Sequence, residues 1–128
     1  MNDLTIYHNP RCSKSRQTLQ IIKDHGIQPI VVEYLKAPLK KSELDNISKL
    51  LNKRPKDFVR KSEADFKENS IKDVIENDIE LINKMVKFPK IIERPIVIYK
   101  NKAIIGRPPE NVLELLNSWN FNLHIYNV

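Results

Sequence analysis

The sequence has 128 residues, 41% of them hydrophobic and 30% charged, a composition that excludes a disordered chain and fits one domain with its own core. Its formal net charge of +6 favours anionic partners, but the basic residues alternate with acidic ones instead of forming a block beside aromatics, which argues against general nucleic-acid binding. No apolar run approaches the roughly 18 residues of a bilayer span and no signal-peptide pattern begins the sequence, so we expect a cytoplasmic protein without a membrane segment.

The first third of the chain predicts a strand, a helix and a second strand. Leu4–Tyr7 is a short apolar run typical of a buried strand, and the turn residues Asn9-Pro10 end it. From Ser13 onwards apolar residues recur at helical spacing until Gly26, a common C-terminal stop. The β-branched run Ile30–Val32 predicts the second strand, and such a unit is expected to be right-handed with parallel strands.

The middle of the chain predicts helices. Ser42 is expected to begin one, with Asp45 at the acidic position of a capping box. Pro55 can begin a short second helix through Phe58 and Val59, and a polar stretch follows at about 62–70. Asp78–Phe88 predicts a further helix before Pro89. Its apolar side is expected to contain Ile79, Ile82, Met85 and Val86.

The last third predicts a hairpin and a helix. Ile96–Tyr99 and Ala103–Ile105 are short apolar runs separated by three polar residues, as in two hairpin strands. Pro108 and Pro109 then begin a last helix with an apolar side. Residues 119–128 are apolar enough to pack but too few to classify.

These elements follow the order βαβ, helices, ββα. The order predicts an α/β fold whose core is completed by the last third of the chain. No repeat or flexible linker separates the parts, so we expect a single domain over residues 1–128 with a helical insertion at about 42–88.

Cys12 is the only cysteine of the chain and lies at or next to the start of the first predicted helix. A thiol reacts as its thiolate, and a helix N-terminus and nearby cations lower its pKa. Arg11, Lys14 and Arg16 are such cations, whereas an inert cysteine is normally buried among apolar residues. We therefore expect a reactive thiol. One cysteine forms no internal disulfide, and the scattered histidines give no metal site, so a redox role needs an outside thiol.

His8 and Arg16 lie four positions before and after Cys12. His8 could assist the thiolate or could be satisfied by backbone groups, and Arg16 could be a solvated charge or a partner of the thiolate or substrate. The Cys12–Arg16 spacing is C-x3-R, not the C-x5-R of phosphatase loops that surround a tetrahedral oxyanion. Ser15 stands where a dithiol C-x-x-C motif has its second cysteine.

Two arginines directly precede prolines, Arg94 in ERPIV and Arg107 in GRPPE. A rigid turn can hold a guanidinium in place, and a guanidinium can clamp an oxyanion through two hydrogen bonds. Taken singly, such an arginine is more often a solvated charge or part of a structural ion pair. Pro95, at the start of a strand, is a candidate for a cis peptide bond.

The stretches YHNPRCSKSR, FVRK, ERPIV and GRPPE, in this order and spacing, resemble the glutaredoxin-coupled arsenate reductase family, which is ArsC-like and related to Spx proteins. The likeness runs over about residues 4–116, and its H-x3-C-x3-R signature consists of His8, Cys12 and Arg16 as catalytic residues. The resemblance implies a thioredoxin-like fold with a helical insertion, in which Pro95 is the cis-proline.

The resemblance also implies how the site works. Cys12 would be the nucleophile that attacks arsenate, while Arg60, Arg94 and Arg107 would bind the oxyanion and its covalent thiol adduct. Arg60 is taken from the resemblance alone, because a single arginine in FVRK otherwise reads as a solvated helix charge. The arrangement is physically sensible, since a thiolate attacks a dianion only when several cations neutralise the substrate.

In this family, glutathione attacks the adduct, arsenic passes from the pentavalent to the trivalent state, and glutaredoxin resolves the remaining mixed disulfide. The resemblance therefore implies an enzyme of arsenic detoxification with glutathione as co-substrate and glutaredoxin or another thiol reductant as partner. It implies no tightly bound cofactor. A monomer is the default expectation for a substrate site of this size.

Two other functions stay open at this point. A Spx-type regulator shares the fold and binds RNA polymerase, but such regulators commonly switch through a C-x-x-C pair, and Ser15 replaces its second cysteine here. A glutathione-dependent thiol transferase could act through Cys12 alone. The arginines favour the oxyanion reductase over both, because neither alternative needs an anion site.

Overall fold

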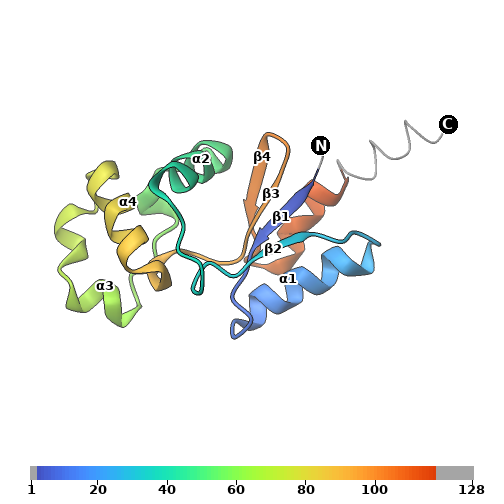
Figure 1. Ribbon diagram of the computed structural model, residues 1–128, viewed down its shortest axis with the longest axis horizontal. Coiled ribbons are helices and arrows are strands. Elements are labelled where there is room, and N and C mark those ends of the chain that lie inside the picture. The colour runs from blue at the N-terminus through green and yellow to red at the C-terminus, as the bar shows by residue number, and fades with distance from the viewer. Residues whose placement is uncertain (1–2, 118–128) are drawn as a thin grey trace. The chain divides into compact units, whose positions relative to one another are not determined.

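A computed structural model describes residues 3–117 of the chain, so the unclassified stretch 119–128 lies outside the described residues. The described chain divides into two compact units (Figure 1). Residues 3–32 and 94–117 make up the first unit, and residues 33–93 make up the second. The expected single domain stays a prediction. No helix within residues 3–117 has the length and apolar character needed to cross a membrane.

The first unit is built on a four-stranded sheet with the order β2-β1-β3-β4. The strands are β1 (Leu4–Tyr7), β2 (Ile30–Val32), β3 (Ile96–Tyr99) and β4 (Lys102–Ile105). β1 pairs in parallel with β2 and antiparallel with β3, and β3 and β4 form an antiparallel hairpin. The predicted strands and their parallel βαβ pair are confirmed, and β4 begins one residue earlier than expected.

Helical segments complete the first unit. α1 (Ser13–Asp24) is followed by Gly26, whose φ of 76° is a left-handed conformation that suits glycine after a helix. The last predicted helix is present as a 3-10 turn, Pro109–Val112, that continues into α-helical residues 113–117. In Figure 1 the sheet, α1 and this segment lie together, and their apolar side chains form one core. The buried core residues are Leu4, Ile6, Ile22, Ile27, Val97, Tyr99, Val112, Leu115 and Leu116.

The end of β4 packs tightly against α1 and the start of β3. A Cβ atom on Gly106 would lie 2.5 Å from Thr18 Oγ1 and 2.8 Å from Pro95 Cγ, so only glycine fits without a shift of its neighbours. Gly106 directly precedes Arg107, and Pro95 directly follows Arg94. The two arginine–proline stretches predicted from the sequence therefore lie side by side over α1.

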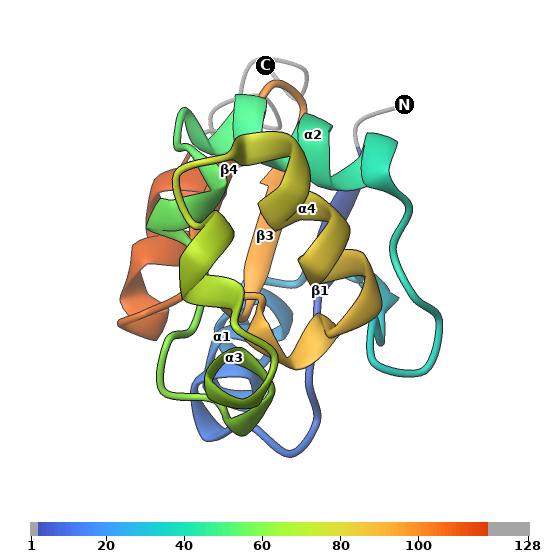
Figure 2. The same ribbon diagram turned by 90° about the vertical axis from the view of Figure 1, so that its left-hand side faces the viewer.

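The second unit is helical (Figure 2). Its α-helices are α2 (Lys41–Leu51), α3 (Ala64–Glu68) and α4 (Asp78–Lys87). Short 3-10 turns cover Pro55–Asp57, Ile71–Val74 and Pro89–Ile91. The helical character predicted for this part is confirmed. The expected polar stretch at about 62–70 contains α3, whose Phe66 is buried, and the short helix predicted from Pro55 ends before Phe58.

The predicted start of α2 was wrong. The helix begins after Lys40, whose backbone N–H donates to Glu43 Oε1 at 3.0 Å, so Glu43 and not Asp45 is the capping carboxylate. Leu39 and Leu44 flank this start and are both buried, at the two positions of a hydrophobic staple. The position at which α2 begins is therefore determined by the burial of Leu39 and not by capping through the Ser42 hydroxyl.

The predicted apolar side of α4 was wrong at Ile79. This side chain is 74% exposed, and the buried residues of the helix are Leu81, Ile82 and Met85. Residues two apart on an α-helix lie about 200° apart around its axis, so Ile79 and Leu81 cannot share one face. The helix buries the side that carries Leu81.

Candidate active site

Cys12 is the residue that precedes α1, with φ −93° and ψ 122°. A tight turn after β1 places it there: the Cys12 N–H donates to Asn9 O at 3.0 Å, and the Arg11 N–H donates to Asn9 Oδ1 at 3.0 Å. The Cys12 carbonyl then accepts the first helical hydrogen bond, from the Arg16 N–H at 3.0 Å. The thiol is a free cysteine of intermediate exposure, at the positive end of a 12-residue helix.

Arg107 and Arg94 lie at this thiol. Arg107 Nη1 donates to Cys12 Sγ at 3.6 Å and to the Arg94 carbonyl at 3.3 Å, so one guanidinium ties the two arginine stretches together beside the sulfur. The Arg94-Pro95 peptide bond is cis, as the sequence suggested, and Arg107-Pro108 is also cis, which was not foreseen. The structure therefore brings three predicted site residues together, and their roles toward a substrate stay predictions.

The surroundings of Cys12 favour its thiolate. Burial raises the pKa of the thiol, but hydrogen bonds from the Ser15 backbone, the Arg94 side chain, the Lys14 backbone and the Arg107 side chain lower it more, and the net pKa is lowered. The backbone donors belong to the first turn of α1 and the side-chain donors to the arginine stretches. The predicted contribution of the helix start is therefore confirmed, whereas the side-chain charges of Arg11, Lys14 and Arg16, which the sequence suggested, are not among the causes of the shift. The contributing cations are Arg94 and Arg107.

His8 is buried and is connected to the start of α1 by Ser15. The His8 Nδ1 and Ser15 Oγ atoms are 2.6 Å apart, and the Asn9 N–H donates to the same Ser15 oxygen at 3.1 Å. Ser15 is fully buried, so its hydroxyl fastens the end of β1 to the helix that presents Cys12. This anchoring function could not be predicted from the sequence, because the contact between His8 and Ser15 forms only when the strand and the helix pack together.

Arg16 supports the turn before the thiol. Its Nη1 donates to the Pro10 carbonyl at 3.0 Å, and the side chain is exposed. The sequence left two interpretations of Arg16 open, a solvated charge and a partner of the thiolate or substrate. The contact adds a third, in which Arg16 stabilises the loop that carries Cys12. A catalytic role for Arg16 stays a prediction.

Asn111 supports the loop of Arg107 in a similar way. Its side-chain amide donates to the carbonyl oxygens of Ile105 at 3.2 Å and Arg107 at 3.1 Å. Its backbone N–H donates to Pro108 O at 3.0 Å. Sequence reasoning missed Asn111, since an asparagine after two prolines and a glutamate is an ordinary surface residue by pattern.

Arg60, the third predicted oxyanion ligand, belongs to the second unit and binds two carboxylates there. Its Nε donates to Glu63 Oε1 at 3.2 Å and its Nη1 donates to Glu93 Oε1 at 2.7 Å. Burial lowers the pKa of the guanidinium, but Glu93 and Glu63 raise it more, so the net pKa is raised and the charge is fixed. The reading of Arg60 as a solvated charge is therefore wrong.

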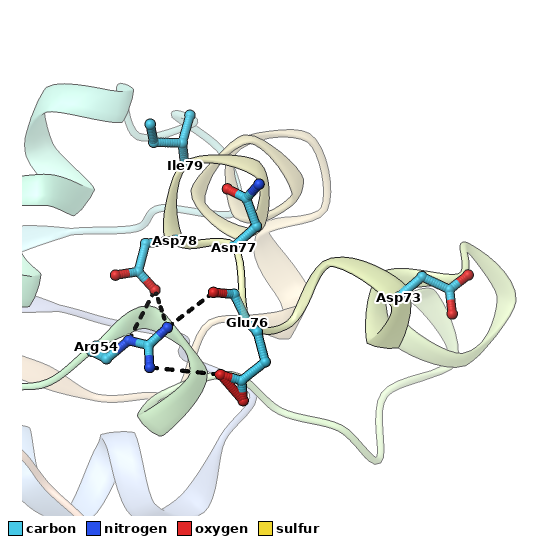
Figure 3. A pocket seen from close by; sticks show the side chains of 6 residues that line it. All are labelled: Arg54, Asp73, Glu76, Asn77, Asp78 and Ile79. Atoms are coloured by element: carbon cyan, nitrogen blue, oxygen red, sulfur yellow. Dashed lines mark hydrogen bonds and ion pairs between the residues drawn. The ribbon is translucent and has the colours of Figure 1, made fainter.

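A second ionic cluster lies in a hollow of the same unit (Figure 3). Arg54 points at Asp78, with 3.1 Å between Nη2 and Oδ1, and lies 3.6 Å from Glu76 Oε2. Arg54 and Asp78 are 46% exposed and Glu76 is 70% exposed, so water screens these ion pairs and they contribute little to stability. None of the predicted site residues lines this hollow.

Comparison with known proteins assigns the family. The ArsC family model matches residues 7–115. An arsenate reductase of Haemophilus influenzae is 42% identical over 112 residues, which cover 87% of this chain and 97% of that protein. The Escherichia coli protein named "Uncharacterized protein YfgD" is 46% identical over 112 residues, which cover 87% and 94% of the two chains.

The solved structures agree. An arsenate reductase from Vibrio cholerae superposes with a TM-score of 0.84 at 40% sequence identity, over 88% of this chain and 97% of that one. The match spans both the sheet unit and the helical unit in sequence, so the predicted thioredoxin-like fold class with a helical insertion is confirmed. With most of its length matched by the family model and by close relatives, the chain belongs to the ArsC family.

Proposed function

We propose that this protein is an oxidoreductase that reduces arsenate to arsenite with Cys12 as the nucleophile. The observation that supports the proposal best is the Cys12 thiol at the start of α1, with the Arg107 guanidinium 3.6 Å from its sulfur and a lowered pKa. We infer arsenate as the substrate from the relatives that are named arsenate reductase. His8 and Arg16 belong to the proposed catalytic set through the family signature.

The charges around the thiol suit an anionic substrate. Arsenate carries negative charge near neutral pH. A thiolate that approaches it is repelled unless cations lie beside both the thiolate and the arsenate. Arg94 and Arg107 suit both groups, because the Arg107 guanidinium donates to the sulfur and the side chains of both arginines lower the pKa of the thiol. Arg60 completes the proposed oxyanion set on the ground of the family resemblance.

The proposed reaction transfers two electrons. The Cys12 thiolate attacks arsenic, a sulfur–arsenic bond forms, and one arsenate oxygen leaves as water after protonation. A glutathione thiol then attacks the adduct, arsenic departs as arsenite with two more electrons, and the two sulfurs remain joined as a mixed disulfide. A second thiol, from glutaredoxin or glutathione, reduces that disulfide and returns Cys12 to its thiol form. Overall, two thiols become one disulfide, and one arsenate becomes one arsenite and one water.

External reductants fit the cysteine count. The chain has one cysteine, so the second and third sulfurs of the cycle must come from other molecules. We propose glutathione as co-substrate and glutaredoxin or an equivalent thiol protein as partner, with no tightly bound cofactor. The Spx-type alternative receives no support at Ser15, since its hydroxyl is buried against His8 at the position of the missing second cysteine.

The proposal is tested by arsenate-dependent oxidation of glutathione in the presence of glutaredoxin. Wild-type protein is expected to turn over, and Cys12→Ser is expected to show no activity above the uncatalysed rate, because an alcohol does not replace the thiolate in this redox chemistry. Arg11→Ala is the matched control: it removes an exposed cation next to Cys12 and keeps the hydrogen-bond donors that lower the pKa of the thiol. Wild type that fails to turn over with every thiol donor would rule out arsenate as substrate.

A binding measurement complements the assay. Isothermal titration of arsenate, phosphate and sulfate into wild type, Arg94→Ala and Arg107→Ala asks whether the arginines form one anion site. We expect either substitution to weaken arsenate binding by about tenfold or more, the usual effect of a lost charge-assisted hydrogen bond. Equal affinities in all three proteins would remove Arg94 and Arg107 from the proposed site.

A further inference from the structure

Arg107 belongs to a loop that is poor in backbone hydrogen-bond donors. The loop joins the end of β4 at Ile105 to the 3-10 turn that begins at Pro109. Pro108 and Pro109 have no backbone N–H, so the two positions after Arg107 cannot donate to any carbonyl oxygen. The donors that fix this part of the loop must therefore come from other groups.

The side chain of Asn111 supplies two such donors. Its Nδ2 donates to Arg107 O at 3.1 Å and to Ile105 O at 3.2 Å. An amide nitrogen carries two N–H donors, which matches these two carbonyl acceptors, whereas an ionised aspartate of the same shape carries only acceptors. The Asn111 backbone N–H also donates to Pro108 O at 3.0 Å. One residue thus connects the end of β4 to the residue that carries the guanidinium.

The strand end before this loop is fixed by close packing. A Cβ atom on Gly106 would lie 2.5 Å from Thr18 Oγ1, so the backbone there lies directly against α1. The same helix begins after Cys12 and presents its thiol. Asn111 extends the region that is fixed relative to this helix from the strand end to the backbone of Arg107.

The position of the Arg107 backbone matters because its guanidinium reaches the sulfur from an exposed side chain. Nη1 lies 3.6 Å from Cys12 Sγ and 3.3 Å from the Arg94 carbonyl oxygen. A charge stabilises a thiolate less as the distance between them grows, and water between them weakens the effect further. A displacement of the loop would therefore weaken the contact with the thiolate even though the arginine itself is still present.

We propose that Asn111 is a positioning residue that holds the backbone of Arg107 where its guanidinium reaches the Cys12 sulfur and an oxyanion bound beside it. Asn111 acts through Arg107 and is not itself a catalytic residue. The part of the inference that concerns an oxyanion rests on the proposed function, whereas the part that concerns the thiol does not. Loss of the Asn111 side chain is expected to resemble a partial loss of Arg107.

The test is a double-mutant cycle between Asn111→Ala and Arg107→Ala, measured by the pH dependence of Cys12 alkylation with iodoacetamide. In the wild-type background, Asn111→Ala is expected to move the midpoint of the profile to higher pH by about 0.3 to 1 unit, because the thiolate loses part of its stabilisation. In the Arg107→Ala background, the same change is expected to move the midpoint by less than about 0.1 unit, because the group through which Asn111 acts is absent.

Two further variants sharpen the test. Asn117→Ala makes the same replacement at an exposed position of the helical residues that follow, so it is the matched control and is expected to keep the wild-type midpoint. Asn111→Ser keeps one donor in place of two, so its midpoint is expected to lie between those of wild type and Asn111→Ala. Asn111→Ala is also expected to lower kcat/KM for arsenate by about fivefold, whereas Asn117→Ala is expected to keep the wild-type value.

The outcomes separate the two proposals. An Asn111→Ala profile that superimposes on that of wild type, or a shift of equal size in the wild-type and Arg107→Ala backgrounds, overturns the positioning role. If Asn111→Ala does not fold, Asn111→Ser in the same two backgrounds decides. The alkylation assay contains no arsenate, so wild type that turns over no arsenate overturns the proposed function, while a shift that depends on Arg107 still supports the positioning of its guanidinium at the thiol.

Discussion

Arg107 Nη1 lies 3.6 Å from Cys12 Sγ although the two residues are 95 positions apart in the sequence. The contact joins the loop after β4 to the start of α1, and both segments belong to the same compact unit. A cation so close to a sulfur stabilises its charged form. The reactivity of the thiol is therefore a property of the folded sheet unit and not of the local YHNPRCSKSR stretch alone.

The first prediction concerns the acidity of Cys12. Because the pKa of the folded thiol is lowered, its alkylation by iodoacetamide is expected to reach half of its maximal rate at a lower pH than that of an unstructured cysteine peptide. Arg107→Ala removes a donor that stabilises the thiolate, so its profile is expected to shift to higher pH. Arg11→Ala, which removes the same charge next to Cys12, is expected to keep the wild-type profile. Superimposable profiles for wild type and Arg107→Ala would contradict this reading of the contact.

A second prediction concerns the buried hydroxyl of Ser15. Ser15→Ala removes the acceptor of the Asn9 N–H and the partner of His8 Nδ1 in a buried place, which is expected to cost about 1–3 kcal/mol of unfolding free energy. Ser13→Ala changes an exposed hydroxyl in the same turn and is expected to stay within about 0.5 kcal/mol of wild type. Urea unfolding followed by circular dichroism measures both. Equal losses in the two variants would mean that the His8–Ser15 contact adds nothing to stability.

The third prediction concerns the close packing at Gly106. Gly106→Ala places a methyl group 2.5 Å from Thr18 Oγ1, so we expect a loss of about 1–3 kcal/mol from overpacking. Thr18→Ala removes two of the three nearest atoms, Oγ1 at 2.5 Å and Cγ2 at 3.0 Å, and leaves Pro95 Cγ at 2.8 Å. The double variant is therefore expected to be more stable than the sum of the single changes by at least about 0.5 kcal/mol. Strict additivity in the unfolding experiments would show that the two side chains do not compete for the same space.

The first unit could be predicted from the sequence because its signals are local. β1 is a four-residue apolar run closed by Asn9-Pro10, and α1 ends at a glycine that adopts positive φ. These residues restrict the backbone by themselves, whatever packs against them. The position of Cys12 at the helix start followed directly, since a turn and a helical pattern meet at that residue.

The remaining features depend on partners far away in the chain. The ion pair between Arg60 and Glu93 joins residues separated by 33 positions, and no pattern around either residue indicates the other. Ser15 is buried and its hydroxyl contacts His8 at the end of β1. In the sequence alone it is an ordinary helix residue, because the contact exists only once β1 and α1 pack together. Ile79 fits the helical spacing of α4 as well as Leu81 does, and only the packing of the unit decides which side faces inward.

The order of the strands has a consequence for the newly made chain. β1 lies in the sheet between β2, which follows it closely in the sequence, and β3, which begins only at Ile96. Until that last third has been synthesised, Cys12 can have the backbone donors of Lys14 and Ser15 but neither of its arginines. Non-local pairings of this kind form late in folding. The pKa of Cys12 thus reaches its full lowering only when the sheet is complete. An unfinished chain exposes a thiol with a more ordinary pKa to the oxidants and metals around it.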